Sequence, residues 1–510
     1  MSVVAAVAGA VAVVGALILF RNDGVFTYTL DDVYIHLALA RSIAAGHYGF
    51  NLAEVSSPSS SILFPFLLVP FVAAGAGTLA PLLIGTAALL ATVYRVHRWA
   101  SFELGASVVA ASVISLAFAF GLNLVSIVFT GLEHSLQILL TVIVCDGIVR
   151  LAREPDTSDV GREFWVAVVC GPLVRYELLA LSLPALALYA IVRGPGRALL
   201  AAAALAAPLV AFSAFLVARG QPWLPTSVIV HAGYADLPRR GLGLVVDVAR
   251  NIIAHANSHA GAVMVMLALV ASVGATLRPV ERRLAVVSFA VLVAQLGFGQ
   301  IGQRYELWAL VALAMLALAA VAPLGWPAPV VARLVLPAAC LALLGLPYLR
   351  ALVLVPASAN DVYRQQYQMG RLVQRLGVRS VAVNDIGLVG WMNPGVYVLD
   401  VVGLAAGESL STRQLGRADS QWLDELANRH QAEVAMLYPG WFPRVPQGWR
   451  LEARIHLGRP PVAVSGDTVI VYALSAASAD RARAVVREAA REMPTGVVLE
   501  DESAPEALPQ

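Results

Sequence analysis

Two adjacent carboxylates, Asp31 and Asp32, follow an apolar run over residues 2–20 at the start of the sequence. Charged side chains are costly beside hydrocarbon, and in membrane proteins they mark functional sites. A carboxylate within hydrogen-bond reach can take the proton that a hydroxyl group loses as it attacks an electrophile. The pair therefore predicts a catalytic centre at the end of an apolar segment.

Two other roles for the pair stay open at this stage. Aspartate is favoured at the N-terminus of a helix, so the pair can cap a helix that starts near Val33, and one carboxylate can cap while the other catalyses. His36 lies four residues after Asp32, on the same face of such a helix, so a metal site is a further alternative.

Polar residues recur at the ends of three later apolar segments. Arginine can clamp a phosphate through bidentate contacts and does not lose its proton, so these positions predict a binding site for an anionic group. The alternatives without a ligand are structural: the charged residues can anchor helix ends at the membrane surface, and Arg175 can form an ion pair with Glu177. The polar residues are Glu133 and His134, then Arg175, Tyr176 and Glu177, then Gln303, Arg304, Tyr305 and Glu306.

The composition indicates a polytopic membrane protein. The 510 residues are 59% hydrophobic and 13% charged, and the mean hydropathy is +0.75. A net charge of +2 does not indicate nucleic-acid binding. The three cysteines all lie in apolar segments, so the sequence offers neither a disulfide framework nor a paired-cysteine metal site.

Eleven apolar runs are predicted to span the membrane. Short loops on one side of these spans carry eleven arginines, against eight in the longer loops of the other side, so we predict a cytoplasmic N-terminus and a C-terminal segment outside. The runs cover residues 2–20, 79–94, 104–121, 132–149, 163–176, 177–192, 198–218, 261–277, 284–300, 305–323 and 329–347.

Outside the spans, three longer parts of the chain are predicted to lie outward: residues 21–78, residues 219–260 and the C-terminal segment. The first outward loop, residues 21–78, contains two segments, 34–45 and 62–74, that read as helices lying at the membrane surface. From residue 357 charged residues return, so we predict a membrane domain over 1–356 and a soluble α/β domain over 357–510. The predicted elements are helices 361–376, 421–430 and 480–492 and strands 380–383, 396–401, 434–437 and 469–472.

Several short motifs and their order along the chain resemble those of the GT-C superfamily of integral-membrane glycosyltransferases. Within that superfamily they are similar to motifs of the arabinofuranosyltransferases of mycobacterial cell-wall assembly. One departure is Tyr176, where that subgroup commonly has proline. The motifs are Asp31-Asp32-Val33-Tyr34 with Ala40-Arg41, Ser57-Pro58-Ser59, Gly131-Leu132-Glu133, Arg175-Tyr176-Glu177, Trp223-Leu224-Pro225-Thr226, Asn384-Asp385-Ile386-Gly387 and Val398-Leu399-Asp400.

The resemblance implies an inverting transfer of a sugar, such as arabinofuranose or another pentose or hexose, from a polyprenyl-phosphate donor to a cell-envelope glycan or lipid. Asp31 matches the base, and Asp32 orients it or binds substrate. Arg175, Arg304 and Arg41 are the expected ligands of the donor phosphate. The expected substrate-binding residues are Tyr34, His36, Glu133, His134, Glu177, Tyr305 and Asp385, although Asp385 can equally shape a turn.

The resemblance further implies a multi-pass protein of the bacterial inner membrane with its active site on the periplasmic face. It requires no cofactor, and a divalent cation is an open alternative. The main competing class is a transporter or flippase, which would have a similar number of spans but would place its polar residues near the bilayer midplane. A scaffold whose outer domain binds a partner is a third class, and it does not account for the clustered acids and arginines.

Overall fold

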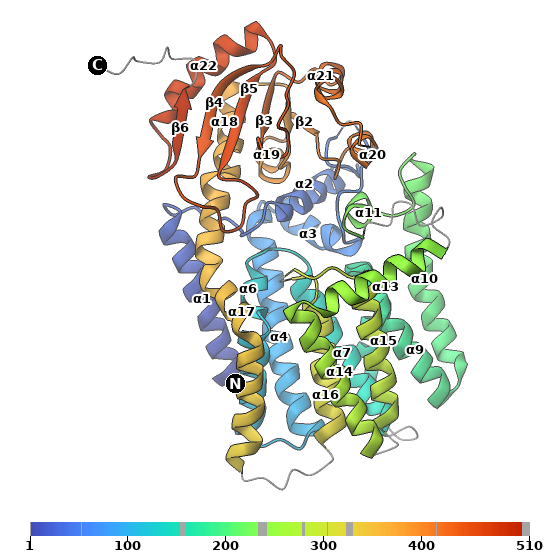
Figure 1. The fold of residues 1–510 in the computed structure, drawn as a ribbon. Helices are drawn as coiled ribbons and strands as arrows, with labels where there is room; N and C mark the ends of the chain where they lie inside the picture. Colours follow the sequence, from blue (N-terminus) through green and yellow to red (C-terminus); the bar gives the residue numbers. More distant parts are fainter. Residues whose placement is uncertain are drawn as a thin grey trace.

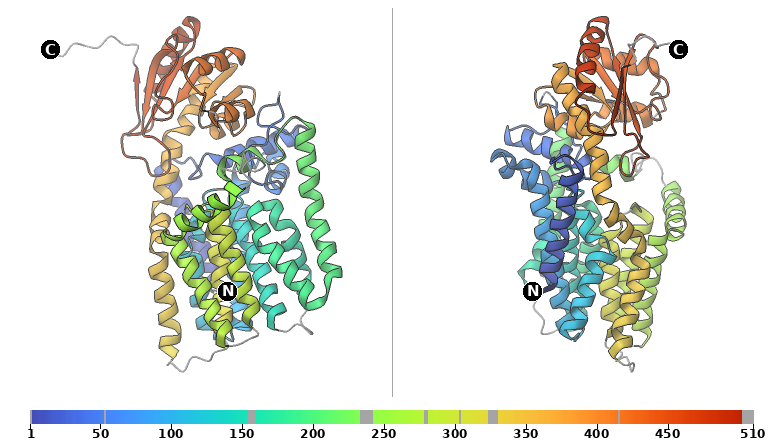
Figure 2. Two further views of the ribbon diagram at one scale, coloured as in Figure 1. Left: turned by 45° about the vertical axis from the view of Figure 1, so that its right-hand side comes forward. Right: turned by 90° about the vertical axis from the view of Figure 1, so that its left-hand side faces the viewer.

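The computed structural model describes residues 2–52, 54–153, 160–232, 242–277, 281–302, 304–322, 330–414 and 416–501. A helical bundle forms one end of the molecule and a sheet domain the other, and helices α2 and α3 lie between the two (Figure 1). The further views in Figure 2 show the same two layers, with α1 in the bundle.

The described part of the bundle consists of long helices joined by short turns. Its elements are α1 (Ser2–Arg21), α4 (Ala80–Glu103), α5 (Val108–Leu116), the π-helical turn η2 (Ala117–Gly121), α6 (Leu124–Val128), α7 (His134–Arg153), α8 (Gly161–Val174), η3 (Tyr176–Leu178), α9 (Leu179–Arg193), α10 (Pro195–Ala218), α14 (His259–Leu277), α15 (Arg282–Phe298), α16 (Leu307–Val321) and α17 (Val330–Arg364).

Helix α1 shows how these helices pack. Val7, Val11, Val14 and Ile18 recur every three or four residues and are buried, which places them on one face. The opposite face is also apolar but exposed, with Phe20 85% accessible. A helix that is apolar on both its packed and its exposed face belongs in lipid, and the chain is accordingly a membrane protein.

The prediction of eleven spans is confirmed only in part. A helix lies within each of the eleven predicted segments. Among the described residues, however, five helices are long and apolar enough to cross a membrane. The number is six if the α13–α14 pair, bent by 95°, counts as one span. Helices α8 and α16 have 14 and 15 residues, whereas a hydrocarbon core needs about 20.

Two surface helices lie where the sequence predicts them. Segments 34–45 and 62–74 correspond to α2 (Asp32–Ala44) and α3 (Leu63–Ala73), followed by the short turn η1 (Gly77–Leu79). The predicted outward segment 219–260 also contains helices, α11 (Thr226–Ala232) and α13 (Leu242–Ala256). In Figure 1, α2 and α3 lie across the top of the bundle, directly beneath the sheet domain.

Helix α17 joins the bundle to the sheet domain. It runs without interruption through residue 357, where the sequence predicts the domain boundary, so the two parts share this helix (Figure 1). The predicted helix 361–376 is broken at Gln365, after which α18 (Gln366–Leu376) begins. The division into residues 1–356 and 357–510 stays a prediction.

The C-terminal part is a six-stranded mixed sheet with the order β2-β1-β3-β5-β4-β6. The first three strands in this order are parallel, and the remaining pairs are antiparallel. The strands are β1 (Ser380–Val383), β2 (Tyr397–Asp400), β3 (Val434–Leu437), β4 (Arg450–His456), β5 (Thr468–Ala473) and β6 (Val498–Asp501).

Helices cover both faces of this sheet. Alternation along β1 sends Val381 and Val383 into one core and Ala382 into the other. Helices α18 and α22 (Ala476–Ala490) contribute to the first core, and α21 (Ser420–Arg429) to the second. The two remaining helices of this part, α19 (Gly387–Met392) and α20 (Gly407–Gln414), flank β2 in the sequence.

All four predicted strands and the predicted helices 421–430 and 480–492 are confirmed to within a few residues, whereas the predicted helix 361–376 is divided between α17 and α18. Four elements, β4, β6, α19 and α20, were not predicted from the sequence. Strand β4, with the sequence Arg-Leu-Glu-Ala-Arg-Ile-His, alternates strictly between polar and apolar residues, so its strand signal was present in the sequence and was overlooked. Strand β6 has only four residues, which is too short for a clear alternation. Their pairing with β5 and with each other is a tertiary effect.

Asn51 covers the edge of the sheet at β2. Its side-chain Nδ2 donates to the carbonyl of Val398 at 3.0 Å, and its Oδ1 accepts from the Val398 N–H at 3.0 Å. Both residues are buried. The side-chain amide thus pairs with the backbone of one residue of the β2 edge, where a neighbouring strand would otherwise bind.

Replacing Asn51 by alanine should lower stability by about 1–3 kcal/mol, because the N–H and carbonyl of Val398 would lose their partners while buried. The expected result is a lower thermal midpoint of the purified protein in detergent, with faster hydrogen exchange at Val398. Asn428→Ala is the control, since that amide donates to Asp424 at an exposed position. Equal effects of the two substitutions would contradict the role assigned to Asn51.

Candidate functional site

Two adjoining cavities lie where the bundle meets the first outward loop. The larger has a volume of about 530 Å³ and is lined mainly by apolar side chains from α9 and α15, with Trp308 of α16. The smaller has a volume of about 40 Å³ and is polar, with Asp32, His36, His134 and Arg304 in its wall. Both cavities are lined by Ser60, Arg175, Ser227 and Tyr305, which mark their junction.

Arg175 lies between two carboxylates at this junction. Its Nη1 donates to Glu133 Oε1 at 2.8 Å, and its Nη2 donates to Glu177 Oε1 at 2.5 Å. Ser60 accepts from the same Nη1 and donates to Glu133. The extended backbone of Arg175, between α8 and η3, turns its side chain toward the cavity wall. The predicted ion pair of Arg175 with Glu177 is therefore present, and Glu133 joins it.

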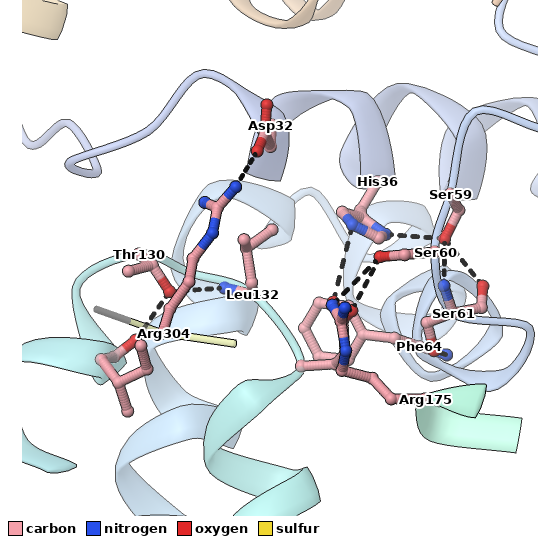
Figure 3. Close-up of polar contacts among 12 residues, drawn as sticks. Asp32, His36, Ser59, Ser60, Ser61, Phe64, Thr130, Leu132, Arg175 and Arg304 are labelled. Atoms are coloured by element: carbon pink, nitrogen blue, oxygen red, sulfur yellow. Dashed lines mark hydrogen bonds and ion pairs between the residues drawn. The ribbon is translucent and has the colours of Figure 1, made fainter. Parts of the chain in front are cut away.

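His36 belongs to the same cluster. It projects from α2, and its Nε2 lies 3.6 Å from Glu133 Oε2. Its Nδ1 shares a hydrogen bond of 3.1 Å with the hydroxyl of Ser59, as Figure 3 shows. The Ser59 hydroxyl donates to the Ser61 carbonyl, which leaves its lone pairs to face the imidazole. The serine segment of the first outward loop thus fixes the orientation of His36.

Arg304 and Asp32 form the other side of the polar cavity. Arg304 Nη2 donates to Asp32 Oδ2 at 3.1 Å and to the Tyr305 hydroxyl at 2.6 Å. Figure 3 shows Asp32 at the start of α2 pointing down toward Arg304. The Asp32 side chain is 42% exposed, so it faces both the arginine and open space. The Tyr305 ring lies near both guanidinium groups, with Arg304 Cζ at 4.7 Å and Arg175 Cζ at 5.6 Å from its centroid.

Three buried nitrogens around the polar cavity have no hydrogen-bond partner among the described residues. They are Arg304 Nη1 and both ring nitrogens of His134. Buried polar groups in folded proteins nearly always have a partner, and an unpaired one costs free energy. Since Arg304 and His134 both line the cavity, a hydrogen-bonding ligand there would satisfy them.

Asp31 faces away from this cavity. Its Oδ2 accepts from the Gly387 N–H at 2.7 Å, and its Oδ1 accepts from the Leu388 N–H at 2.8 Å. Both oxygens thus cap the first turn of α19 in the sheet domain. Capping of a helix is the alternative that the sequence left open, but the capped helix is α19 and not α2.

Arg41 holds the opposite end of α19. Its guanidinium donates to the carbonyls of Gly390 and Trp391 at 2.9 and 2.7 Å, and it lies 5.0 Å from the centroid of the Trp391 ring. Asp31 and Arg41, at the two ends of α2, therefore complement the positive and negative ends of the short helix. The structure places Arg41 at this contact between domains, apart from Arg175 and Arg304.

Two further predicted residues lie outside the cavities. Asp385 Oδ2 accepts from Gln366 Nε2 and from the Tyr438 hydroxyl, both at 2.8 Å. The Tyr34 hydroxyl accepts from the backbone N–H of Tyr28 and is buried. The structure thus gathers eight predicted site residues and places four elsewhere. The gathered ones are Asp32, His36, Glu133, His134, Arg175, Glu177, Arg304 and Tyr305; Gln303 lies outside the described residues.

The pKa of the Asp31 carboxyl is raised in the folded protein. Burial raises the pKa of this carboxyl to about 8, and the neighbouring charge of Asp385 adds to this effect, while the N–H groups of Leu388 and Gly387 oppose it. Burial also raises the pKa of Asp385. The two carboxyls thus bring at least one proton into the contact between α2 and the sheet domain near neutral pH.

Sequence reasoning assigned no role to Ser60 and Leu404, which both line the polar cavity. Ser60 lies in the serine-rich segment after Pro58, and that segment was the available signal. Leu404 had no signal of its own, because it belongs to the sheet domain and reaches the cavity only through the folded arrangement. Among the described residues no group of three or more His, Cys, Asp or Glu side chains is placed to hold a metal ion.

Comparisons with known structures identify the fold. ArnT from Cupriavidus metallidurans bound to undecaprenyl phosphate matches with a TM-score of 0.55 and 14% identity, over 93% of this chain and 98% of that one. The same enzyme in the apo state matches with a TM-score of 0.50 and 13% identity, over 94% and 99%. The archaeal oligosaccharyltransferase AglB from Archaeoglobus fulgidus matches with a TM-score of 0.46 and 12% identity, over 97% and 75%.

Comparisons of the sequence with known families and proteins match only part of the chain. A family described as a domain of unknown function, DUF8728, matches residues 359–472, which lie in α17 and the sheet domain. No curated protein sequence matches the chain. The likeness to ArnT extends over nearly the whole of both chains, so the predicted GT-C fold is confirmed, together with a small C-terminal sheet domain. The arabinofuranosyltransferase subgroup is not shown by these comparisons.

The raised pKa of Asp31 predicts a pH dependence of stability. In the unfolded chain this carboxyl has its ordinary value of 3.8, so the folded protein binds the extra proton between about pH 4 and pH 8. The stabilisation it contributes is present below about pH 4 and is lost as the pH rises toward 8. Asp31→Asn does not titrate and resembles the protonated form, so its thermal midpoint should fall less than that of the parent over this range.

The measurement is thermal unfolding of both proteins in detergent at several pH values from 5 to 9. Asp480→Asn serves as the control, because that side chain is 82% exposed. A difference between parent and Asp31→Asn that does not change with pH would contradict the assignment.

Proposed function

We propose that this protein is a membrane glycosyltransferase that moves a sugar from a polyprenyl-phosphate donor to a hydroxyl-bearing acceptor of the cell envelope. The observation that carries the proposal is the junction of a large apolar cavity with a small polar one, at which buried donors of Arg304 and His134 lack partners among the described residues. An amphipathic donor, with a long hydrocarbon tail and an anionic head, matches this pair of cavities.

The apolar cavity suits the first units of a polyprenyl chain. Its wall is formed largely by apolar side chains, and its volume of about 530 Å³ is within the usual range of ligand pockets. The phosphate would then lie at the junction, near Arg175, Arg304 and Tyr305. The ArnT structure that this chain resembles contains undecaprenyl phosphate, which makes such a lipid the first donor carrier to test.

Arg304 is the phosphate ligand that the geometry favours most. Arg175 is already bonded to Glu133 and Glu177, whereas Arg304 Nη1 is buried and unpaired among the described residues. A charge-assisted hydrogen bond from this nitrogen to a phosphate oxygen would remove the cost of the unpaired group. His134 would donate a second hydrogen bond from one ring nitrogen.

Asp32 is the better placed of the two carboxylates to act as the base. Both oxygens of Asp31 accept backbone hydrogen bonds from α19, while Asp32 lines the polar cavity and is partly exposed. A phosphate bound to Arg304 would compete with Asp32 for the guanidinium and leave the carboxylate free to accept a proton. We therefore assign the base to Asp32 and the attachment of the sheet domain to Asp31.

The proposed reaction is a single displacement. The acceptor oxygen forms a bond to the anomeric carbon as its proton passes to Asp32, and the bond from that carbon to the phosphate oxygen breaks. Configuration at the anomeric carbon inverts. The polyprenyl phosphate leaves with an additional negative charge, which Arg304 and Arg175 would stabilise.

In this proposal the active site lies on the outer face of the inner membrane, and the transferred sugar is a pentose or hexose.

A transporter or flippase is the competing class. In the described chain the polar groups lie at helix ends, with His134 at the start of α7, Arg175 at the end of α8 and Arg304 shortly before α16. Transporters more often bind substrate near the midplane of the bilayer, so this arrangement favours the transferase.

Asp32→Asn should reduce sugar transfer at least about 100-fold, the usual contribution of a positioned base. Asp31→Asn is the matched comparison, since Asp31 contacts the sheet domain and does not line the cavity, and it should lose less activity than Asp32→Asn. The measurement is product formation by purified protein in lipid, with a panel of polyprenyl-phosphate pentoses and hexoses as donors. Large loss in Asp31→Asn with full activity in Asp32→Asn would return the base to Asp31.

Arg304→Ala should weaken binding of undecaprenyl phosphate at least about tenfold, because one charge-assisted contact is removed. Arg304→Lys should recover part of this loss, since lysine retains the charge without the planar fork. Binding of undecaprenyl phosphate to the purified protein is the readout, and it needs no knowledge of the sugar. Unchanged binding in Arg304→Ala, or movement of substrate across sealed vesicles without formation of a glycosidic bond, would contradict the proposal.

A further inference from the structure

The sheet domain contributes a side chain to the polar cavity. Leu404 lies in the segment 401–406 between β2 and α20, and it lines the cavity together with Asp32, His36 and Arg304. Pro58 of the first outward loop also lines it. The wall of the cavity is therefore completed from a part of the chain that packs above α2, on the side away from the bundle (Figure 1).

Asp400 holds the Leu404 segment in one conformation. Its Oδ1 accepts from the N–H groups of Val402 and Gly403 at 2.8 and 2.9 Å, and its Oδ2 accepts from Ala405 at 2.7 Å. Three backbone donors on one buried carboxylate make a tight turn around Leu404. This accounts for the Val398-Leu399-Asp400 motif, to which the proposed reaction gives no chemical role.

Gly403 makes the turn possible. Its φ of +109° lies in a region that residues with a side chain rarely adopt. A Cβ at this position would lie 2.4 Å from the backbone nitrogen of Leu410. The turn is therefore defined by its backbone as well as by Asp400, and Leu404 is presented from a rigid support.

The polar cavity is too small for a sugar as it stands. A water molecule takes up about 10–15 Å³ of cavity volume, so a cavity of about 40 Å³ holds roughly three waters. A pentose or hexose has roughly ten or more non-hydrogen atoms, each of a size comparable to a water. Side chains that wall the cavity must therefore move when a substrate occupies it, and Leu404 is the one supplied by the sheet domain.

The two cavities suggest separate routes for the two substrates. The donor lipid would reach the junction through the apolar cavity, on the side of the bundle. The acceptor hydroxyl must then reach Asp32 from the other side, where α2 and the sheet domain meet. Leu404 lies on that side, and with Ile35 and Leu132 it gives the polar cavity apolar contacts that fit the C–H face of a sugar ring.

We propose that Leu404 determines which acceptors reach Asp32, so that the sheet domain selects the acceptor by the size of the group that fits beneath this side chain. The inference rests on the proposed glycosyl transfer and names an additional specificity residue for it. The acceptor class is a glycoside, whose hydroxyl approaches Asp32 while its ring packs against Leu404.

The test compares Leu404→Trp and Leu404→Ala with the parent, using octyl monosaccharides and octyl disaccharides as acceptor probes. Leu404→Trp should raise the acceptor KM at least tenfold and leave the donor KM within twofold. Leu404→Ala should reduce the preference between the two acceptor sizes. Val396→Ala is the matched control, since Val396 also packs partly buried against the same core of the sheet domain but does not line the cavity.

A second readout does not depend on activity. In Leu404→Cys, labelling of the thiol by a maleimide should slow at least threefold when the octyl glycoside is present, whereas labelling of Val396→Cys should not change. Unaltered labelling of Leu404→Cys, or Leu404 variants that change the donor KM alone, would overturn the inference. A parent protein that transfers no sugar from any lipid donor would instead overturn the proposed function, and the labelling result would still decide whether Leu404 meets a glycoside.

Discussion

The pair of hydrogen bonds from Gly387 and Leu388 to the Asp31 carboxylate joins the sheet domain to the helix that carries Asp32. With the bonds from Arg41 at the other end of α19, these contacts fix the sheet domain above α2. The position of Leu404 over the polar cavity depends on that attachment. The site is thus assembled from two parts of the chain that are held together by the side chains of Asp31 and Arg41 at the ends of one short helix.

The two neighbouring aspartates serve different partners because of helical geometry. Successive residues of an α-helix point about 100° apart, so adjacent side chains at its start cannot face the same neighbour. Asp31 points toward α19 and Asp32 points toward Arg304. One helix can in this way attach a domain with one carboxylate and present the other to a cavity, which makes the position of the domain and that of the proposed base interdependent.

Charge balance explains why the cluster is stable when it is buried. Arg175 has carboxylates on two sides and a serine hydroxyl between them, so its desolvation is offset by short charge-assisted bonds. Arg304 is less completely paired, with a single carboxylate partner at Asp32 and an unpaired Nη1 among the described residues. The difference between the two arginines supports a mainly structural part for the first and a ligand-binding part for the second.

The sequence by itself determined the membrane class, the surface helices, four of the strands and eight of the residues that gather at the cavities. Apolar periodicity and the order of short motifs carry this information, because both are local properties of the chain. Only the tertiary structure decided the roles of Asp31, Arg41 and Leu404. The partners of Asp31 and Arg41 lie hundreds of residues away in the sheet domain, and Leu404 of that domain meets Asp32 and His36, which are equally distant in the sequence. The sequence shows that two adjacent carboxylates are present, but the direction in which each one points depends on what packs against the helix.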